Sequence, residues 1–322
     1  MLCLSQHDIL KAVSLNEVMD VIETALKLDQ TGQVFMPPRS HIDYGGGTLL
    51  LMPCFTKQSF GTKLVTVFPE NASKNAPAVT GVVVLNDAET GVPTALIDGR
   101  ILTAIRTGAV GGVSIRHLAS NTAKTLGVVG AGLQGYYQAL CAMTARNIED
   151  LFIYDLFEKN LTVFSEKVAE EFPEVKVHKA ASTEELLEAS DIVITTTTAK
   201  EPVLPNNKDL FAGKHFIGVG SFQPHVQEYP KAVFDACEQV FIDTEHALEE
   251  TGDLIIPLKE GWVSRDQIIT MGSLLVNGLD TTELKKKTTF FKSVGMAAFD
   301  LLASQLVYEK AKAKGLGYEF TM

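Results

Sequence analysis

The sequence is poor in the features that mark extracellular, membrane-spanning and metal-binding proteins. It contains only four cysteines, scattered without metal-ligand spacing, so we expect free thiols, a reducing compartment and no metal site. No window reaches the roughly 18 consecutive apolar residues of a transmembrane helix. The first stretch, MLCLSQHDIL, turns polar too early for a signal peptide. The cytoplasm is therefore the expected location.

Positive charge is also scarce. The chain has 28 Lys and Arg against 39 Asp and Glu, which gives a formal net charge of −11. Proteins that bind nucleic acid need a surplus of cations along one surface, so this balance argues against a nucleic-acid partner. At 322 residues, with 46% hydrophobic and 21% charged residues, the chain is long enough for two globular domains.

Residues 119–287 alternate short apolar runs with helical segments. Such alternation predicts an α/β domain with a parallel, doubly wound sheet. The expected strands are 126–130, 151–155, 175–178, 191–196, 215–220 and 239–243. The expected helices are 134–145, 158–171, 183–189 and a shorter one near 229–237.

The rest of the chain, residues 1–118 and 288–322, predicts a second domain of the α+β class. Apolar residues recur at helical spacing in 6–32 and 101–119. Between them, 36–96 carries short apolar runs bounded by Gly, Pro, Asn and Asp, which is typical of strands in a mixed or antiparallel sheet. We expect a strand and a long helix after residue 288, with the helix packed back on this domain.

A glycine-rich motif opens the α/β domain. It reads Gly130-Ala131-Gly132-Leu133-Gln134-Gly135 and fits G-x-G-x-x-G. An apolar strand enters it and a helix leaves it, which is the context of a dinucleotide-binding loop. Gly130 permits the tight turn, Gly132 lets the backbone approach a pyrophosphate, and Gly135 permits close helix–strand packing. The phosphates would lie on N–H groups at the helix N-terminus. The motif predicts a Rossmann domain with these six residues in the cofactor site.

Asp155 ends the second expected strand, 20 residues after Gly135. An acid at this position accepts hydrogen bonds from the adenosine ribose and repels a 2′-phosphate, which favours NAD(H) over NADP(H). Lys159 lies close enough in sequence to weaken that preference, so NADP(H) stays open. The alternative is that Asp155 only caps the following helix.

Three cations of the α+β domain stand in unusual settings. Arg39 follows two prolines, Lys63 begins the apolar strand KLVTVF, and Arg106 lies in the otherwise apolar helix TAIRTGAVGG. Each alone could be a surface residue whose stem packs on apolar neighbours. Together they suggest a site for a small carboxylate.

Stretches along the whole chain carry a family resemblance. They are MPPR (36–39), GTKLVTVFPEN (61–71), ETGVPTALIDG (89–99), TAIRTGAVGG (103–112), GVVGAGLQG (127–135), ITTTTA (194–199), GVGS (218–221), EETGDL (249–254) and FKSVGMAAFD (291–300). In these stretches the chain resembles the ornithine cyclodeaminase and mu-crystallin family, whose members include cyclodeaminases, an alanine dehydrogenase and ketimine reductases.

The resemblance implies a homodimer and a set of site residues. Arg39, Lys63 and Arg106 are expected to hold the substrate carboxylate facing the nicotinamide. Hydrogen bonds to the substrate are expected from Thr80 and Ser293. The cofactor contacts that the family implies beyond the glycine motif and Asp155 are Thr196, Thr197, Gly220, Ser221 and Lys292.

Departures from the family pattern indicate the ketimine-reductase branch. Cyclodeaminases carry an Asp where this chain has Phe222, and a phenyl ring cannot orient the attacking water or accept a proton. Lys292-Ser293 replaces an Asp-Ser pair of the deaminating enzymes and matches the mu-crystallin-like form. Leu49-Leu50 replaces polar residues, which suits a cyclic substrate better than a free amino side chain.

The sequence therefore predicts NAD(P)H-dependent reduction of a cyclic ketimine, pyrroline-2-carboxylate or piperideine-2-carboxylate, to L-proline or L-pipecolate. Lys63 is the expected catalytic residue, either as proton donor near the imine nitrogen or as a second carboxylate contact. Its pKa would have to be lowered by its cationic neighbours for the acid role. His225, beside the SFQP stretch, is a less favoured donor. The alternatives are an ornithine cyclodeaminase, an alanine dehydrogenase, or a binding protein without catalytic activity.

Overall fold

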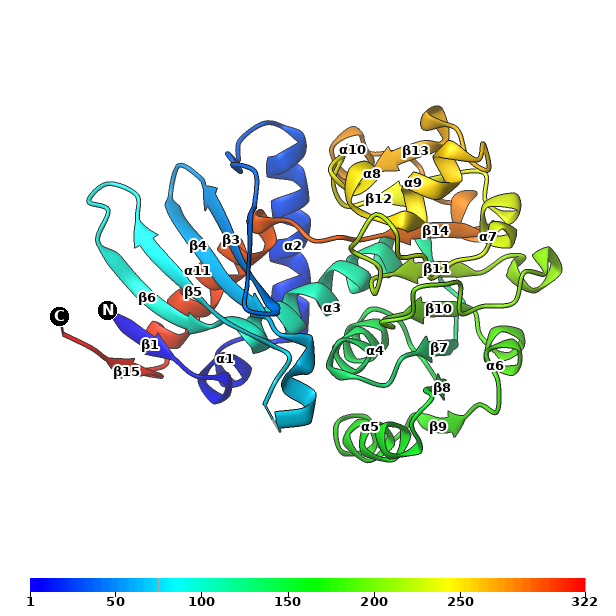
Figure 1. Ribbon diagram of the computed structural model, residues 1–322, viewed down its shortest axis with the longest axis horizontal. Helices are drawn as coiled ribbons and strands as arrows, with labels where there is room; N and C mark the ends of the chain where they lie inside the picture. The colour runs from blue at the N-terminus through cyan, green and yellow to red at the C-terminus, as the bar shows by residue number, and fades with distance from the viewer. Residues whose placement is uncertain (75, 322) are drawn as a thin grey trace. The chain divides into compact units, whose positions relative to one another are not determined.

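The computed structural model describes residues 1–74 and 76–321, which divide into two units. Unit 1 comprises Met1–Arg106 and Met296–Met322, and unit 2 comprises Thr107–Gly295. Figure 1 shows both units coloured along the chain. Each unit has its own sheet, as the sequence pattern predicts.

Unit 1 is built on a seven-stranded mixed sheet in the order β15-β1-β6-β5-β4-β3-β2. Only β1 and β6 pair in parallel, and every other neighbouring pair is antiparallel. The strands are β1 (Leu2–Leu4), β2 (Ser40–Tyr44), β3 (Gly47–Phe55), β4 (Ser59–Val67), β5 (Val79–Asp87), β6 (Pro93–Asp98) and β15 (Tyr318–Glu319). The predicted mixed sheet is confirmed.

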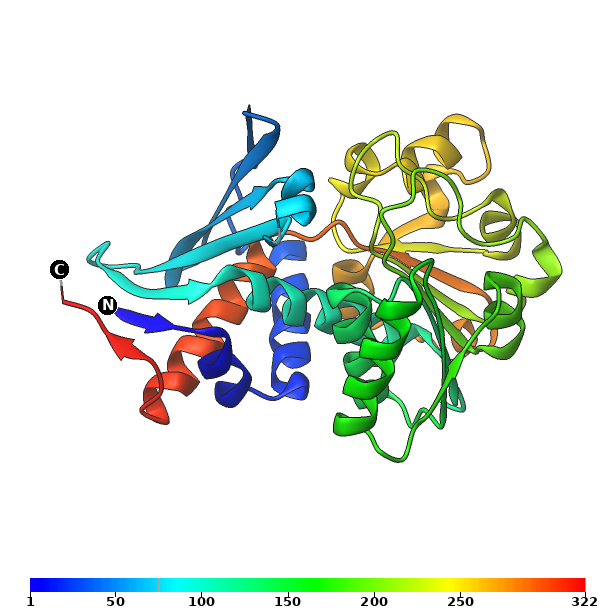
Figure 2. The same cartoon turned by 60° about the horizontal axis from the view of Figure 1, so that its bottom comes forward.

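Helices cover one face of this sheet (Figure 2). They are α1 (Gln6–Ala12), α2 (Leu15–Gln30) and α11 (Ala297–Ala313), and η1 (Pro69–Lys74) is a short 3₁₀ turn. Ser5 and Ser14 each form a capping box with the acid three residues further along the chain. The box at Ser14 starts α2 and so separates it from α1. The α11 helix packs against β3, β4 and β5 as well as α2, so the C-terminal segment returns to unit 1 as expected.

The boundary between the units falls inside α3 (Gly99–Leu118) rather than at its end, where the sequence analysis places it. A side chain at Gly99 would meet the backbone of Gly81 in unit 1, whereas one at Gly108 would meet the backbone of Tyr137 in unit 2. The two halves of α3 therefore pack in different units. None of the helices in the described part of the chain is long and apolar enough to cross a membrane.

Unit 2 is an eight-stranded parallel sheet in the order β13-β12-β14-β11-β10-β7-β8-β9. Its strands are β7 (Thr125–Val129), β8 (Asp150–Tyr154), β9 (Lys176–Lys179), β10 (Ile192–Thr195), β11 (His215–Gly218), β12 (Val240–Ile242), β13 (Ile268–Thr270) and β14 (Thr289–Lys292). Its helices and 3₁₀ turns are α4 (Leu133–Ala145), α5 (Glu158–Glu171), α6 (Thr183–Ala189), η2 (Lys208–Phe211), α7 (Lys231–Ala236), α8 (Ala247–Glu250), α9 (Gly252–Lys259), η3 (Arg265–Gln267), α10 (Met271–Asn277) and η4 (Leu284–Lys286).

All six predicted strands of the doubly wound sheet are present. The predicted boundary at residue 287 is wrong for β14, because that strand pairs with β11 on one side and β12 on the other. It therefore belongs to the parallel sheet, and the chain returns to unit 1 only at Met296. The edge strand β13 was not predicted.

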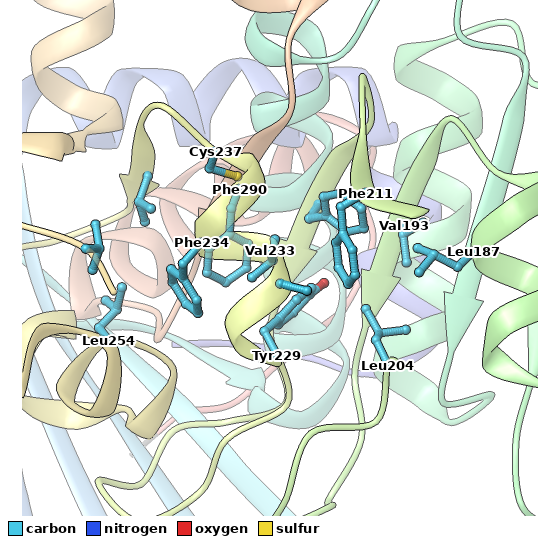
Figure 3. Close-up of a cluster of buried hydrophobic side chains, with 14 of the residues drawn as sticks. Leu187, Val193, Leu204, Phe211, Tyr229, Val233, Phe234, Cys237, Leu254 and Phe290 are labelled. Carbon is cyan, nitrogen blue, oxygen red and sulfur yellow. The ribbon is translucent and has the colours of Figure 1, made fainter. Parts of the chain in front are cut away.

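An aromatic cluster in unit 2 fixes the strands that carry the loops discussed below (Figure 3). The rings of Tyr229 and Phe290 lie 4.5 Å apart, and Phe234 meets Phe290 edge-on at 5.6 Å. The Tyr229 hydroxyl donates a hydrogen bond of 2.9 Å to the carbonyl of Ile217 in β11. Full burial of each such ring contributes about 1.5–3 kcal/mol to folding, so the cluster holds the loop after β11 against the sheet.

Candidate functional site

The glycine motif occupies the turn from β7 into α4. Gly130 has a φ of 102°, a conformation that glycine adopts without strain. A Cβ on Gly135 would lie 2.0 Å from the Gly130 carbonyl oxygen, so the helix approaches the turn too closely for any side chain. A Cβ on Gly132, in contrast, would meet no atom within 4 Å. The backbone is thus open at Gly132, the position where the motif requires room for a pyrophosphate.

Asp155 follows β8 and binds the glycine motif directly. Its Oδ2 accepts a hydrogen bond of 2.8 Å from the Ala131 N–H, and its Oδ1 accepts from the Phe157 N–H at 2.9 Å and from Asn160 Nδ2 at 3.1 Å. Asp155 therefore holds the glycine turn and also binds Phe157 and Asn160 where α5 begins. The nearby Lys159 side chain is exposed. The expected contact of Asp155 with the ribose is compatible with this geometry, because a carboxylate has about four acceptor sites.

Four of the other expected cofactor residues follow β10, which neighbours β7 in the sheet, and β11, which neighbours β10. Thr196 Oγ1 donates to the Gly130 carbonyl at 2.9 Å, which joins its loop to the glycine motif. Thr197, Gly220 and Ser221 all donate hydrogen bonds to Glu228. The fold thus brings these loops to one edge of the sheet, where ligands bind in open α/β proteins.

Lys292 ends β14 beside the last residue of β11, Ser293 follows it, and both side chains are buried. Lys292 Nζ is 2.8 Å from Asp253 Oδ2, and both side chains are wholly buried. Ser293 Oγ donates to Asp243 Oδ2 at 2.7 Å and is also buried. Their polar groups bind the buried acids Asp253 and Asp243, and the expected contacts of both residues with a ligand stay predictions.

In unit 1, Lys63 and Arg106 meet at the carboxylate of Asp300. Lys63 Nζ lies 2.7 Å from Asp300 Oδ2, and Arg106 Nε lies 3.0 Å from Asp300 Oδ1. All three side chains are buried. Lys63 comes from β4, Arg106 from the end of the unit-1 part of α3, and Asp300 from the first turn of α11. The fold therefore assembles two of the three expected cations around one acid.

These charges shift the pKa values of the cluster. Burial lowers the pKa of Lys63 to about 8, Asp300 opposes that shift, and the charges of Arg106 and Arg39 add to it. Burial alone would raise the pKa of Asp300, but the charges of Arg106 and Lys63 outweigh it and lower that pKa. The influence of Arg39 on Lys63 places it near enough to complete the expected set of three cations. The pKa of the Lys63 ammonium group therefore lies well below that of an ordinary lysine, at about 8.

Thr80 lies apart from this cluster. It pairs with Thr66 across β4 and β5, and their hydroxyls are 3.0 Å apart. Lys63 pairs with Val83, and alternate residues of a strand point to opposite faces, so Thr80 is on the other face of the sheet. The expected substrate contact of Thr80 has no support in this arrangement. Leu50, which pairs with Val65, is on the Lys63 face.

Asp300 was missed by the sequence analysis, although its stretch FKSVGMAAFD was noted. The sequence does contain a signal for Asp300, because it is a single acid within the apolar segment AAFDLLA, just as Arg106 is a single cation within an apolar helix. Buried charges are nearly always paired, so two such residues suggest partners. Glu228 and Asp253 were missed too.

Among the described residues, no group of three or more His, Cys, Asp or Glu is arranged to hold a metal ion.

Comparisons with known proteins place the chain in a family. The family model described as "Ornithine cyclodeaminase/mu-crystallin family" matches residues 1–315. The chain belongs to this family.

Members of the family with known names are similar to the chain over its whole length. It is 36% identical over 323 residues to a Delta(1)-pyrroline-2-carboxylate reductase of Bacillus cereus, covering 98% of each protein. It superposes on the same enzyme of Thermococcus litoralis, solved with NADH and L-proline, with a TM-score of 0.92, 34% identity and coverage of 99% and 100%. An archaeal alanine dehydrogenase dimer with bound NAD gives a TM-score of 0.90 at 26% identity, with coverage of 100% and 99%.

Two further residues bear on the branch within the family. Phe222, at the position where cyclodeaminases are expected to carry an acid, lies after β11 with 57% of its surface exposed. The neighbouring His225, the less favoured proton donor, is exposed on the same loop.

The Asp300→Asn variant tests the charge cluster. We expect the free energy of unfolding to fall by about 3–5 kcal/mol, because two buried cations lose their counter-ion. The pKa of Lys63 should fall below its value of about 8, since Asp300 raises it. Urea unfolding and an NMR titration of the Lys63 Cε resonance measure the two effects. Glu89→Gln, an exposed acid of unit 1, is the control. An unchanged Lys63 titration in Asp300→Asn would contradict the pairing.

Proposed function

We propose that this protein reduces a cyclic ketimine, pyrroline-2-carboxylate or its six-membered homologue, to L-proline or L-pipecolate with NAD(P)H. The observation that carries the proposal is the buried Lys63–Asp300–Arg106 cluster, which offers cations to a carboxylate and a titratable ammonium group. The similarity to reductases named for pyrroline-2-carboxylate supports the same substrate class.

Residues of unit 2 fit a dinucleotide. The pyrophosphate would lie over Gly132 and the first turn of α4, where a cap without a side chain leaves backbone N–H groups for an anion. Asp155 would accept hydrogen bonds from the adenosine ribose, and its charge favours NAD(H). The bound nicotinamide supplies the hydride that reduces the C=N bond.

The cations of unit 1 would bind the substrate and supply a proton. Arg39 and Arg106 hold the carboxylate, and a planar guanidinium suits that geometry. Reduction of an imine adds hydride to carbon and a proton to nitrogen. Lys63 provides that proton, because an acid with a pKa of about 8 is mostly protonated at neutral pH and still releases its proton readily. Asp300 keeps Lys63 and Arg106 in place while the imine is reduced to the amine.

The rival reactions of the family need a different group. Hydrolytic deamination requires a base that orients water, and Phe222 has no acceptor for that purpose. Release of ammonia from ornithine, or oxidation of alanine, would therefore argue for another branch. A binding protein would hold the cofactor without turnover.

A spectrophotometric assay tests the proposed reaction. We expect rapid oxidation of NADH when pyrroline-2-carboxylate is added, slower oxidation of NADPH because of Asp155, and formation of proline. Ornithine and alanine, offered with NAD⁺, serve as controls. No oxidation with either ring size of imine, together with ammonia release from ornithine, would refute the proposal.

The role of Lys63 is tested by two substitutions. Lys63→Met should lower kcat by about 10²–10⁴-fold, the usual contribution of a general acid. Lys63→Arg should lose a similar factor, because a guanidinium keeps the charge but does not release its proton. In the wild type, kcat should fall as the pH rises through about 8, as Lys63 loses its proton. If Lys63→Arg retains most of the activity, Lys63 only binds the carboxylate.

We further infer that the protein is a homodimer joined through the sheet of unit 1. The face opposite α11 presents Leu64 and Val84 beside exposed Ile42, Tyr44 and Val82. Apolar side chains gathered on one face of a sheet mark an interface. A second copy of this chain is the occupant that the dimeric alanine dehydrogenase of the same fold supports.

Val82→Glu tests the dimer. We expect this variant to shift the protein from dimer to monomer, because the interface would bury an unpaired charge. Light scattering after gel filtration gives the mass directly. Leu10→Glu, at an exposed position of α1 away from that face, should leave the mass unchanged. A wild-type mass of one chain would rule out the assembly.

The cysteines support the expected cytoplasmic location. All four are free thiols, and three of them are buried. Burial raises the pKa values of Cys54 and Cys141 to about 12, so neither forms a reactive thiolate at neutral pH. Buried free thiols are typical of proteins kept in a reducing compartment.

A further inference from the structure

Glu228, in the loop after β11, has a wholly buried carboxylate that binds two other loop segments. Its Oε1 accepts hydrogen bonds from the Thr197 N–H at 2.7 Å and the Thr197 hydroxyl at 2.8 Å. Its Oε2 accepts from the N–H groups of Gly220 at 2.7 Å and Ser221 at 3.2 Å. One oxygen therefore holds the end of β10, and the other holds the end of β11.

The position of Glu228 is itself fixed by buried charge. Asp253 Oδ1 accepts hydrogen bonds from the Glu228 N–H at 2.8 Å and the Tyr229 N–H at 3.1 Å, and its Oδ2 pairs with Lys292. The fit around the carboxylate is close, because a Cβ on Gly220 would lie 2.5 Å from Glu228 Oε1. The carboxylate therefore has little freedom to move within the folded unit.

The two segments that Glu228 joins border the expected cofactor site. β10 lies beside β7, and Thr196 donates a hydrogen bond to the carbonyl of Gly130 in the glycine motif. In a doubly wound sheet, the ligand lies outside the carboxyl ends of the strands, where the strand order reverses. Here the strand order runs from β7 to β8 on one side and to β10 on the other. The spacing of the loops after β10 and β11 therefore shapes one wall of that site.

We propose that Glu228 is a positioning residue for the dinucleotide, holding the loops after β10 and β11 at the separation that the cofactor needs. The inference rests on the cofactor assignment of the proposed function and goes beyond it. Glu228 is wholly buried and acts through Thr197, Gly220 and Ser221, which donate hydrogen bonds to it. An ionised carboxylate suits this task because it only accepts hydrogen bonds, and it faces four donors.

Glu228→Gln is the most informative variant because it keeps the shape of the side chain. The amide would turn an NH₂ group toward the N–H donors of one loop, and that loop should move away. We expect the dissociation constant of NADH, measured by fluorescence titration, to rise about tenfold or more, which corresponds to roughly the strength of one buried hydrogen bond to a charged group. The KM for the imine at saturating NADH should change much less. Glu228→Asp keeps the charge but is one methylene shorter, and it should weaken NADH binding by a smaller factor.

Tyr229→Phe is the matched control. It removes the buried hydrogen bond that the hydroxyl of the next residue donates to the Ile217 carbonyl in β11, and it leaves the four hydrogen bonds that Glu228 accepts in place. We expect it to lower the thermal stability but leave the NADH dissociation constant unchanged. Amide hydrogen exchange in the cofactor-free proteins adds a second readout: Thr197, Gly220 and Ser221 should exchange faster in Glu228→Gln and not in Tyr229→Phe.

The outcomes separate this inference from the proposed function. If wild type binds NADH and Glu228→Gln binds it equally well, the positioning role is refuted while the reductase proposal stands. Equal weakening in Glu228→Gln and Tyr229→Phe would reduce Glu228 to a purely structural residue. If wild type binds neither NADH nor NADPH, the cofactor assignment fails, and the role of Glu228 fails with it. If Glu228→Gln does not fold, the comparison of Glu228→Asp with Tyr229→Phe decides.

Discussion

The carboxylate of Asp300, buried between Lys63 and Arg106, is the constraint on which the arrangement of unit 1 depends. Three ionised groups out of water are costly to the fold unless they compensate one another. Compensation requires β4, α3 and α11 to meet at one point, although Lys63 and Asp300 are 237 positions apart in the chain. The C-terminal helix therefore completes a site that the N-terminal sheet begins. The same geometry leaves a net positive charge, which is what a carboxylate substrate requires.

Unit 2 follows the same principle with the opposite sign. Glu228 and Asp253 are buried acids, and the buried Lys292 of β14 pairs with Asp253. Burial raises the pKa of Glu228, and the charge of Asp253 adds to that rise, whereas Lys292 opposes it. These buried groups hold loops in place. The core itself is stabilised by the aromatic cluster around Tyr229 and Phe290 (Figure 3). In both units, then, buried charged side chains fix the positions of residues that are expected to bind a ligand.

Family membership and the site carry different kinds of information. The match over residues 1–315 establishes the family and the fold. It leaves the reaction to particular side chains, because members with this fold include a reductase and an alanine dehydrogenase. Phe222 at the position of an expected acid, and Lys63 with a pKa near neutrality, are the features that favour reduction of an imine over hydrolysis.

The sequence by itself determined six of the eight strands of the parallel sheet, the mixed character of the other sheet, and the glycine motif. Strand and helix periodicity is local, and Gly130 and Gly135 serve the same turn, so six strands of unit 2 could be placed from the pattern alone. Only the tertiary structure decided which residues meet. It paired Lys63 with Asp300 and placed Thr80 on the opposite face of the sheet from Lys63. It also buried Lys292, which ends the interior strand β14, and Ser293, which follows that strand. Those outcomes depend on strand register and on contacts between residues far apart in the chain, and neither is encoded in any short stretch of sequence.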